Sequence, residues 1–94
     1  MKNKYDISEF VGKSTKRSIH AEIVERFIKR RKEQKISQKE LAIKSGVSYA
    51  SVRRFEEIGE ISFSSLLSLA QAINCLDDFN SLFSFSNVKD LKDY

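Results

Sequence analysis

The sequence predicts an all-α fold, a compact bundle of about five short helices with an N-terminal arm and a short C-terminal tail. Apolar residues recur at spacings of three and four in several segments, which is the pattern of helices with one buried face. Two helix-start signals follow one another between residues 37 and 48, and the chain contains no proline that would interrupt a helix. Its 94 residues suffice for one domain with one modest core.

The charge is distributed unevenly along the chain. Residues 1–54 hold 15 of the 17 Lys and Arg residues and six acidic residues, a net charge of +9, whereas residues 55–94 hold two basic and seven acidic residues, a net charge of −5. A basic half attracts a polyanion because binding releases condensed counterions, and an acidic half should face away from it. A basic run such as residues 29–32 is equally typical of a solvated helix face, so charge alone leaves both interpretations open.

Composition argues against several classes of protein. No apolar run approaches the roughly 20 residues of a membrane helix, and the N-terminus lacks the apolar core of a signal peptide. Cys75 is the single cysteine, so no internal disulfide is possible and a cytoplasmic location is expected. His20 is the single histidine, and no cluster of Cys, His and carboxylates suggests a metal site or a catalytic triad. We therefore expect no enzyme, no catalytic residues, no metal and no cofactor.

The first helix is predicted from Ile19 to near Gln34, after an arm formed by residues 1–18. The prediction of this helix rests on one apolar stripe, which is formed by Ile19, Ile23, Val24, Phe27 and Ile28. The same stripe continues to Arg31 and puts its guanidinium at the edge of the core, where it needs a carboxylate partner. Glu56, on the inward side of the third predicted helix, is the expected partner.

The second helix is predicted over Gln38 to Ser45. Ser37 is followed three residues later by Glu40, which is the capping box that satisfies free amides at a helix start. Gly46 is the residue best able to end this helix in a left-handed conformation.

The same signals repeat almost at once, with Ser48 as the cap of a third helix after a turn of about three residues. Apolar residues flank both caps as hydrophobic staples, Ile36 with Leu41 and Val47 with Val52. Helices joined this tightly cross at a steep angle, and the small side chain of Ala42 lets them approach. The segment from Ser37 to Glu56 therefore predicts a helix-turn-helix.

The remaining elements are a fourth helix, from a cap at Ser62 to about Ile73, and a short fifth helix capped by Asp77. The fifth helix is expected to contain Phe79, Leu82 and Phe83. Residues 83–86 alternate like a strand, and residues 89–94 are typical of a solvated tail. We therefore predict a helix-turn-helix domain over residues 19–83 and a tail over 84–94, which is a possible dimer contact.

The third helix has an outward face that suits base recognition. When Val52 and Phe55 point into the core, a step of about 100° per residue turns Arg53 and Arg54 to the opposite side. In a helix-turn-helix the second helix of the motif enters the major groove and the first crosses the backbone. We predict base contacts from Tyr49, Ala50, Ser51, Arg53 and Arg54, and phosphate contacts from Ser37, Gln38, Lys39 and Ser48. Taken singly, each of these side chains is more often a solvated or packing residue, whereas together they favour DNA.

The segment SQKELAIKSGVSYASVRRFEE resembles the DNA-binding domain of the Xre family, the Cro and phage-repressor type of helix-turn-helix. The residues that carry the resemblance are Arg31, Ser37, Gln38, Glu40, Leu41, Ala42, Gly46, Val47, Ser48, Val52 and Glu56, and the similarity covers about residues 21–76. It implies a regulator of transcription, with a repressor the favoured role, that binds double-stranded DNA through Gln38 on phosphate and through Tyr49, Ala50, Arg53 and Arg54 on bases. It also implies a core pair of Arg31 with Glu56. The acidic loop over residues 56–60 departs from the family pattern and weakens phosphate contacts there.

The resemblance also implies partners. Members of the family commonly form homodimers through the helices after the motif, and Leu82, Phe83 and Phe85 offer an apolar surface for this. The same residues are equally suited to closing the core of the monomer. The alternative function is an antitoxin or protein-interaction module that binds and neutralises a partner toxin, with DNA binding as autoregulation.

Overall fold

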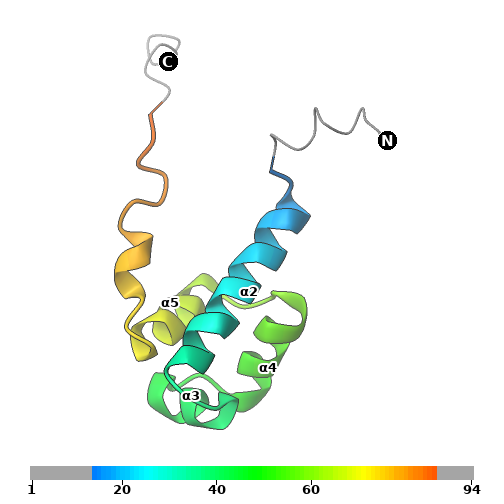
Figure 1. Cartoon of the computed structure of the whole chain (residues 1–94), viewed down its shortest axis with the longest axis vertical. Helices are drawn as coiled ribbons and strands as arrows, with labels where there is room; N and C mark the ends of the chain where they lie inside the picture. The colour runs from blue at the N-terminus through cyan, green and yellow to red at the C-terminus, as the bar shows by residue number, and fades with distance from the viewer. Residues whose placement is uncertain (1–13, 87–94) are drawn as a thin grey trace.

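The computed structural model describes residues 14–86, so most of the predicted arm and tail, residues 1–13 and 87–94, lie outside it. The helices in chain order are α2 (Lys16–Glu33), α3 (Gln38–Ser45), α4 (Tyr49–Ile58), α5 (Phe63–Ala72) and the 3-10 helix η1 (Leu76–Phe79) (Figure 1). No strand occurs within the described residues, and the predicted all-α class is confirmed. No helix in residues 14–86 combines the length and the apolar composition needed to cross a bilayer.

Helix α2 begins three residues before the predicted start at Ile19, so the predicted boundary of the arm at residue 18 was wrong and falls inside the helix. Thr15 is the N-cap: its hydroxyl accepts the Ser18 amide at 3.0 Å, and the Ser18 hydroxyl accepts the Thr15 amide at 3.0 Å. This reciprocal pair satisfies two free amides, which is why the helix starts ahead of its first apolar residue.

Helices α3 and α4 begin at their predicted caps. The Ser37 and Ser48 hydroxyls accept the amides of Glu40 and Ser51, at 3.0 and 3.1 Å. Helix α3 ends at Gly46 with φ of 78°, a left-handed conformation that carries little penalty in glycine. The two helices are thus held close together by a connection of only three residues.

The core lies where α3, α4 and α5 meet under the C-terminal half of α2. It consists of Phe27, Ile36, Leu41, Val47, Val52, Phe55, Leu69, Ala70, Ile73 and Cys75. Phe27 and Phe55 pack edge to face, with ring centroids 5.2 Å apart. Full burial of an aliphatic side chain such as Leu41 or Val52 stabilises the fold by roughly 1.5–3 kcal/mol. Both staple pairs are therefore part of the core.

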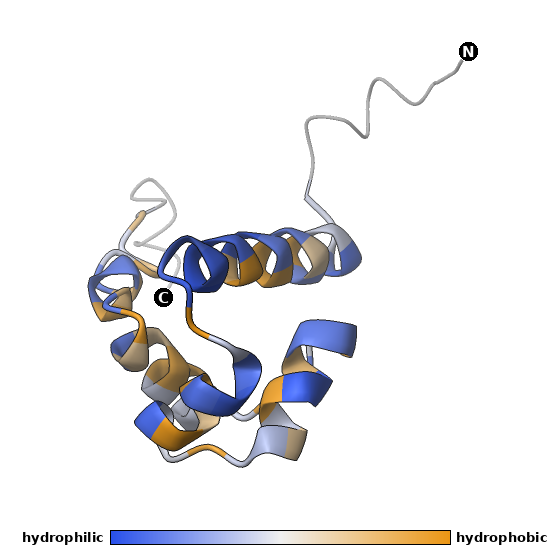
Figure 2. Ribbon diagram, turned by 60° about the horizontal axis from the view of Figure 1, so that its bottom comes forward, coloured by the Kyte–Doolittle hydropathy of each residue, from blue (hydrophilic) through white to orange (hydrophobic). Residues whose placement is uncertain are grey.

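Two polar contacts attach the end of α2 to the end of α5. The Gln34 amide donates to the Ile73 carbonyl at 2.7 Å, and the Arg30 guanidinium donates to the Cys75 sulfur at 3.1 Å. Figure 1 shows the first turns of α2 extending past α4 and α5, and Ile19 and Ile23, at the start of the apolar stripe, are exposed at 39% and 40%. Figure 2 shows α2 lying across the other helices.

The predicted fifth helix was wrong in type and extent. The chain forms the four-residue helix η1, which begins before Asp77 and has no side-chain cap. Leu82 and Phe83 follow in turns and are exposed, and residues 83–86 form no strand. Phe79 is the apolar residue of this segment that packs against the core. With so little apolar surface to bury, the local pattern does not sustain an α-helix.

Candidate nucleic-acid interface

Helix α4 is held so that one side is buried and the other is open. Val52 and Phe55 are buried in the core, at 0% and 2% exposure, whereas Ala50, Arg53 and Arg54 are exposed. The N-terminus of α3 opens beside the start of α4, since Lys39 reaches the ring of Tyr49. The structure therefore presents the outward residues of α4 and the first turn of α3 to solvent as one surface.

A buried ion pair fixes α2 against α4. Arg31 donates to both carboxylate oxygens of Glu56, from Nε at 2.7 Å and from Nη2 at 2.9 Å, and its Nη1 donates to the Ile36 carbonyl at 2.7 Å. The exposed fractions of the two side chains are 8% and 4%. The salt bridge expected from the sequence is thus formed, and its role is to hold the orientation of α4, since neither side chain reaches the surface.

Gln38 joins this buried network. Its side-chain amide donates one hydrogen bond to the Glu56 carboxylate at 2.8 Å. The side chain predicted to contact phosphate is therefore partly engaged by the buried ion pair. The backbone amides of Gln38 and Lys39 lie in the first turn of α3, outside the helical hydrogen-bond ladder. These two amides and the helix dipole are the groups that this end of α3 offers to an anion.

The two serines assigned to phosphate contacts, Ser37 and Ser48, act as helix caps. Ser48 accepts the Ser51 amide and donates its own hydroxyl to the Ser51 hydroxyl at 2.9 Å. Ser37 forms a full capping box with Glu40, whose carboxylate accepts the Ser37 amide at 2.8 Å. This hydrogen bond to the Ser37 backbone is the main reason that the pKa of Glu40 is lowered from its ordinary value.

Three of the predicted contact residues come together at the start of α4. The Tyr49 ring lies 5.7 Å from the Lys39 ammonium and 5.8 Å from the Arg53 guanidinium, as cation–π pairs. Contacts with two cations restrict the ring and keep positive charge beside it. The arrangement fits a surface for a polyanion that carries flat, stackable groups.

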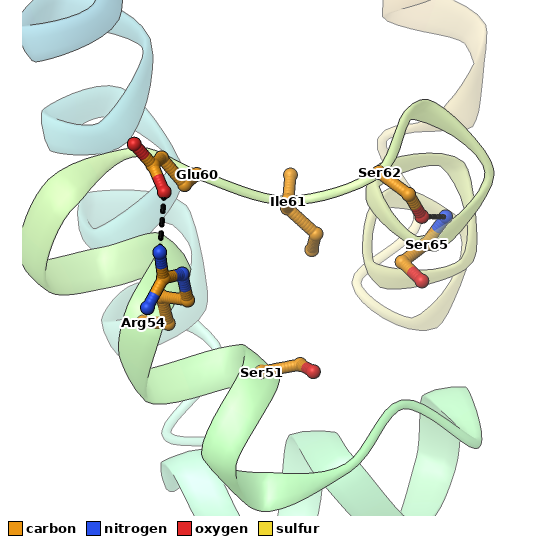
Figure 3. A pocket seen from close by; sticks show the side chains of 6 residues that line it. All are labelled: Ser51, Arg54, Glu60, Ile61, Ser62 and Ser65. Carbon is orange, nitrogen blue, oxygen red and sulfur yellow. Dashed lines mark hydrogen bonds and ion pairs between the residues drawn. The ribbon is translucent and has the colours of Figure 1, made fainter.

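The sequence reasoning missed the carboxylate partners of the two outward arginines. Arg53 pairs with Glu57 at 3.4 Å, and Arg54 pairs with Glu60 at 2.6 Å (Figure 3). The i,i+4 spacing of the first pair is a signal that sequence reading can use. The second pair spans Gly59, whose φ of 76° ends α4, and no spacing rule predicts it. Arg54 and Glu60 line a shallow polar pocket with Ser51, Ile61, Ser62 and Ser65.

Within residues 14–86, no group of three or more His, Cys, Asp or Glu side chains is arranged to hold a metal ion. Cys75 is buried in the core, where it packs as a small apolar side chain.

Comparison with known proteins gives one family. The model of a helix-turn-helix family matches residues 27–78, a span of more than half of the chain that includes all of α3, α4 and α5 and most of η1. No curated protein and no solved structure matches the chain. The family consists of DNA-binding domains without a catalytic function. Because α3 and α4 form the motif and the family model matches more than half of the chain, the chain belongs to the helix-turn-helix family of Cro and phage-repressor type, the Xre-type DNA-binding regulators.

Proposed function

We propose that this protein is a cytoplasmic repressor of transcription that binds a specific duplex DNA sequence, with α4 in the major groove. The observation that carries the proposal is the outward face of α4, where Tyr49, Arg53 and Arg54 are exposed while the opposite face is fixed in the core. The Arg31–Glu56 pair supports it by holding α4 in one orientation. A helix held in one orientation enters the groove with little loss of conformational entropy.

The outward residues of α4 have the chemistry for base reading. Arg53 and Arg54 each carry a planar fork of donors that matches the O6 and N7 acceptors of guanine. The methyl group of Ala50 and the ring of Tyr49 suit apolar contact with the methyl group of thymine, and the hydroxyl of Ser51 suits a base or sugar oxygen. These contacts would define the sequence that is recognised.

The start of α3 has the chemistry for phosphate. Lys39 supplies a charge, and the backbone amides of Gln38 and Lys39 face out from the positive end of the helix dipole. The Ser37 and Ser48 hydroxyls, already engaged as caps, would reach phosphate at the edges of the motif. These contacts would set the register of the protein on the duplex and carry little sequence information.

The test is selection of bound duplexes from a random library, followed by affinity measurements on the enriched sequence and on its single-base variants. Arg54→Ala is expected to relax discrimination at one base pair by roughly 10- to 100-fold, the equivalent of about 1–3 kcal/mol. Lys39→Ala is expected to weaken binding to all sequences alike and to reduce the salt dependence. Arg26→Ala, an exposed arginine of α2, is the matched control. Failure to enrich any sequence would disprove the proposed function.

We also propose that the protein acts as a homodimer through the segment after α5. Phe83 and Phe85 are almost fully exposed there, and Leu82 is half exposed, which leaves an apolar surface for a second copy. A dimer would bind two half-sites about one helical turn apart. Sizing of the purified protein by light scattering tests this, and a monomer at micromolar concentration would contradict it.

A second candidate function is that of an antitoxin that binds a partner toxin. The same exposed aromatic residues favour it, because a partner protein would bury them equally well. Stoichiometric copurification with one other protein would support this function, and Phe83→Ser should then abolish the copurification.

A further inference from the structure

Two carboxylates neutralise the arginines on the outward face of α4. The guanidinium of Arg54 lies 2.6 Å from the Glu60 carboxylate, and that of Arg53 lies 3.4 Å from the Glu57 carboxylate. All four side chains are more than half exposed, so both pairs lie at the surface that is proposed to meet DNA. The acidic loop is therefore part of this surface and not a separate feature.

A left-handed residue at the end of α4 precedes the shorter pair. Gly59 has φ of 76° and ends α4, and Glu60, which follows it, lies beside Arg54 (Figure 3). Glu57 reaches Arg53 from one turn later on the same helix. Each arginine thus has its own acid, placed by backbone geometry.

We propose that Glu57 and Glu60 determine specificity by suppressing sequence-independent binding to DNA phosphates. This inference rests on the proposed function of the α4 surface. A guanidinium paired with a carboxylate carries little net charge, so its attraction to the phosphate backbone is weakened. A carboxylate beside the groove is itself repelled by phosphate. The affinity for random DNA falls most, because sequence-independent binding depends almost wholly on charge.

Base reading survives the pairing because a guanidinium has more donors than the carboxylate uses. The guanidinium has five N–H groups, and the hydrogen bond to Glu60 engages Nη2 of Arg54. The remaining donors stay available for the acceptors of a guanine, a contact that depends on hydrogen-bond geometry more than on net charge. Each pair therefore lowers the affinity for random DNA more than the affinity for the correct site.

The experiment compares Glu57→Gln, Glu60→Gln and the double variant with the wild-type protein on two probes. One probe is a random-sequence 24-bp duplex, and the other is the duplex selected as described above. The affinity of Glu60→Gln for the random duplex is expected to rise several-fold at low salt. The slope of log K against log salt should steepen by up to about 0.9 for each arginine freed to meet a phosphate. The selected duplex should gain less, so that the ratio of specific to random affinity falls.

Asp78→Asn is the matched control, because it removes the same charge from an exposed carboxylate in η1, outside the α4 surface. Thermal melting verifies that each variant is folded, which is expected because both acids are exposed. Gains for Glu57→Gln and Glu60→Gln that do not exceed those of Asp78→Asn would overturn the inference. Equal gains on both duplexes would overturn it as well. Both results leave the proposed function standing, whereas a wild-type protein that selects no duplex would overturn the two together.

Discussion

One arginine–carboxylate pair lies on the inner side of α4, and the shorter of the two outer pairs differs from it in burial. Glu56 binds Arg31 on the inner side, where the exposed fractions of the side chains are 4% and 8%. Glu60 binds Arg54 on the outer side, where the exposed fractions are 59% and 63%. The shortest distances are nearly equal, 2.7 and 2.6 Å, so geometry alone does not separate the roles of the two pairs.

The difference in burial separates the roles. A buried carboxylate that loses its partner is left with an uncompensated charge in a medium of low dielectric constant, so the inner pair cannot be exchanged at low cost. An exposed pair is solvated and screened and is worth at most about 1 kcal/mol, so a phosphate or a base can replace it. The same chemistry thus fixes the helix on one side and leaves it available to a ligand on the other.

The largest expected effect is the loss of the inner pair. Glu56→Ala leaves Arg31 buried without its carboxylate and removes the acceptor of Gln38, so it should lower the free energy of unfolding by about 3 kcal/mol or more. For a domain of this size the melting temperature should fall by more than about 10 °C, measured by circular dichroism. Glu60→Ala is the matched control and should change stability by less than about 0.5 kcal/mol. An unchanged melting temperature for Glu56→Ala would refute the structural role of the inner pair.

The next effect concerns Gly59, which links the end of α4 to Glu60. Gly59→Ala must hold a left-handed backbone at a cost of about 1–2 kcal/mol. Its Cβ would also lie 2.8 Å from Nδ1 of His20 and 3.5 Å from a methyl carbon of Val24. Gly46→Ala is the matched control, because Gly46 has a similar φ of 78° but no atom within 4 Å of its Cβ.

Chemical denaturation of both glycine variants should therefore show a loss of stability in each and a larger loss for Gly59→Ala. His20→Ala in the Gly59→Ala background should recover the additional part. A Gly59→Ala variant as stable as the wild-type protein would contradict the left-handed turn that places Glu60.

The inner side of α4 was predictable from the sequence, because local rules place it. Ser37 and Ser48 fix where α3 and α4 begin, and the apolar stripe that leads to Arg31 identifies Glu56 as its partner. These signals act over a few residues or along a helix face, which is the range where helix geometry dictates position.

The outer side was less predictable, because its contacts depend on turns and on tertiary packing. The Arg54–Glu60 pair needs the left-handed turn at Gly59, and sequence spacing does not give its direction. In the segment after α5, Leu82 and Phe83 follow Phe79 at the helical spacings of three and four. Both side chains are nevertheless exposed, and the segment forms turns. Local pattern is an adequate guide only where a buried partner exists.

The smallest expected effect tests whether burial alone separates structural carboxylates from exchangeable ones. Glu40 is exposed, like Glu60, yet its carboxylate accepts the Ser37 amide in the capping box of α3. That backbone hydrogen bond, together with the Ser37 hydroxyl, lowers the pKa of Glu40 below its ordinary value of 4.5. The folded state thus prefers the ionised carboxylate more than the unfolded state does. The resulting stabilisation is complete above the ordinary pKa and is lost as the pH falls through the lowered one.

Glu40→Gln keeps an oxygen for the Ser37 amide, so its melting temperature should stay close to that of the wild-type protein at pH 7 and fall less steeply in acid. Parallel melting curves for Glu40→Gln and the wild-type protein from pH 7 to pH 3 would show that Glu40 is as exchangeable as Glu60, and that burial is the whole distinction.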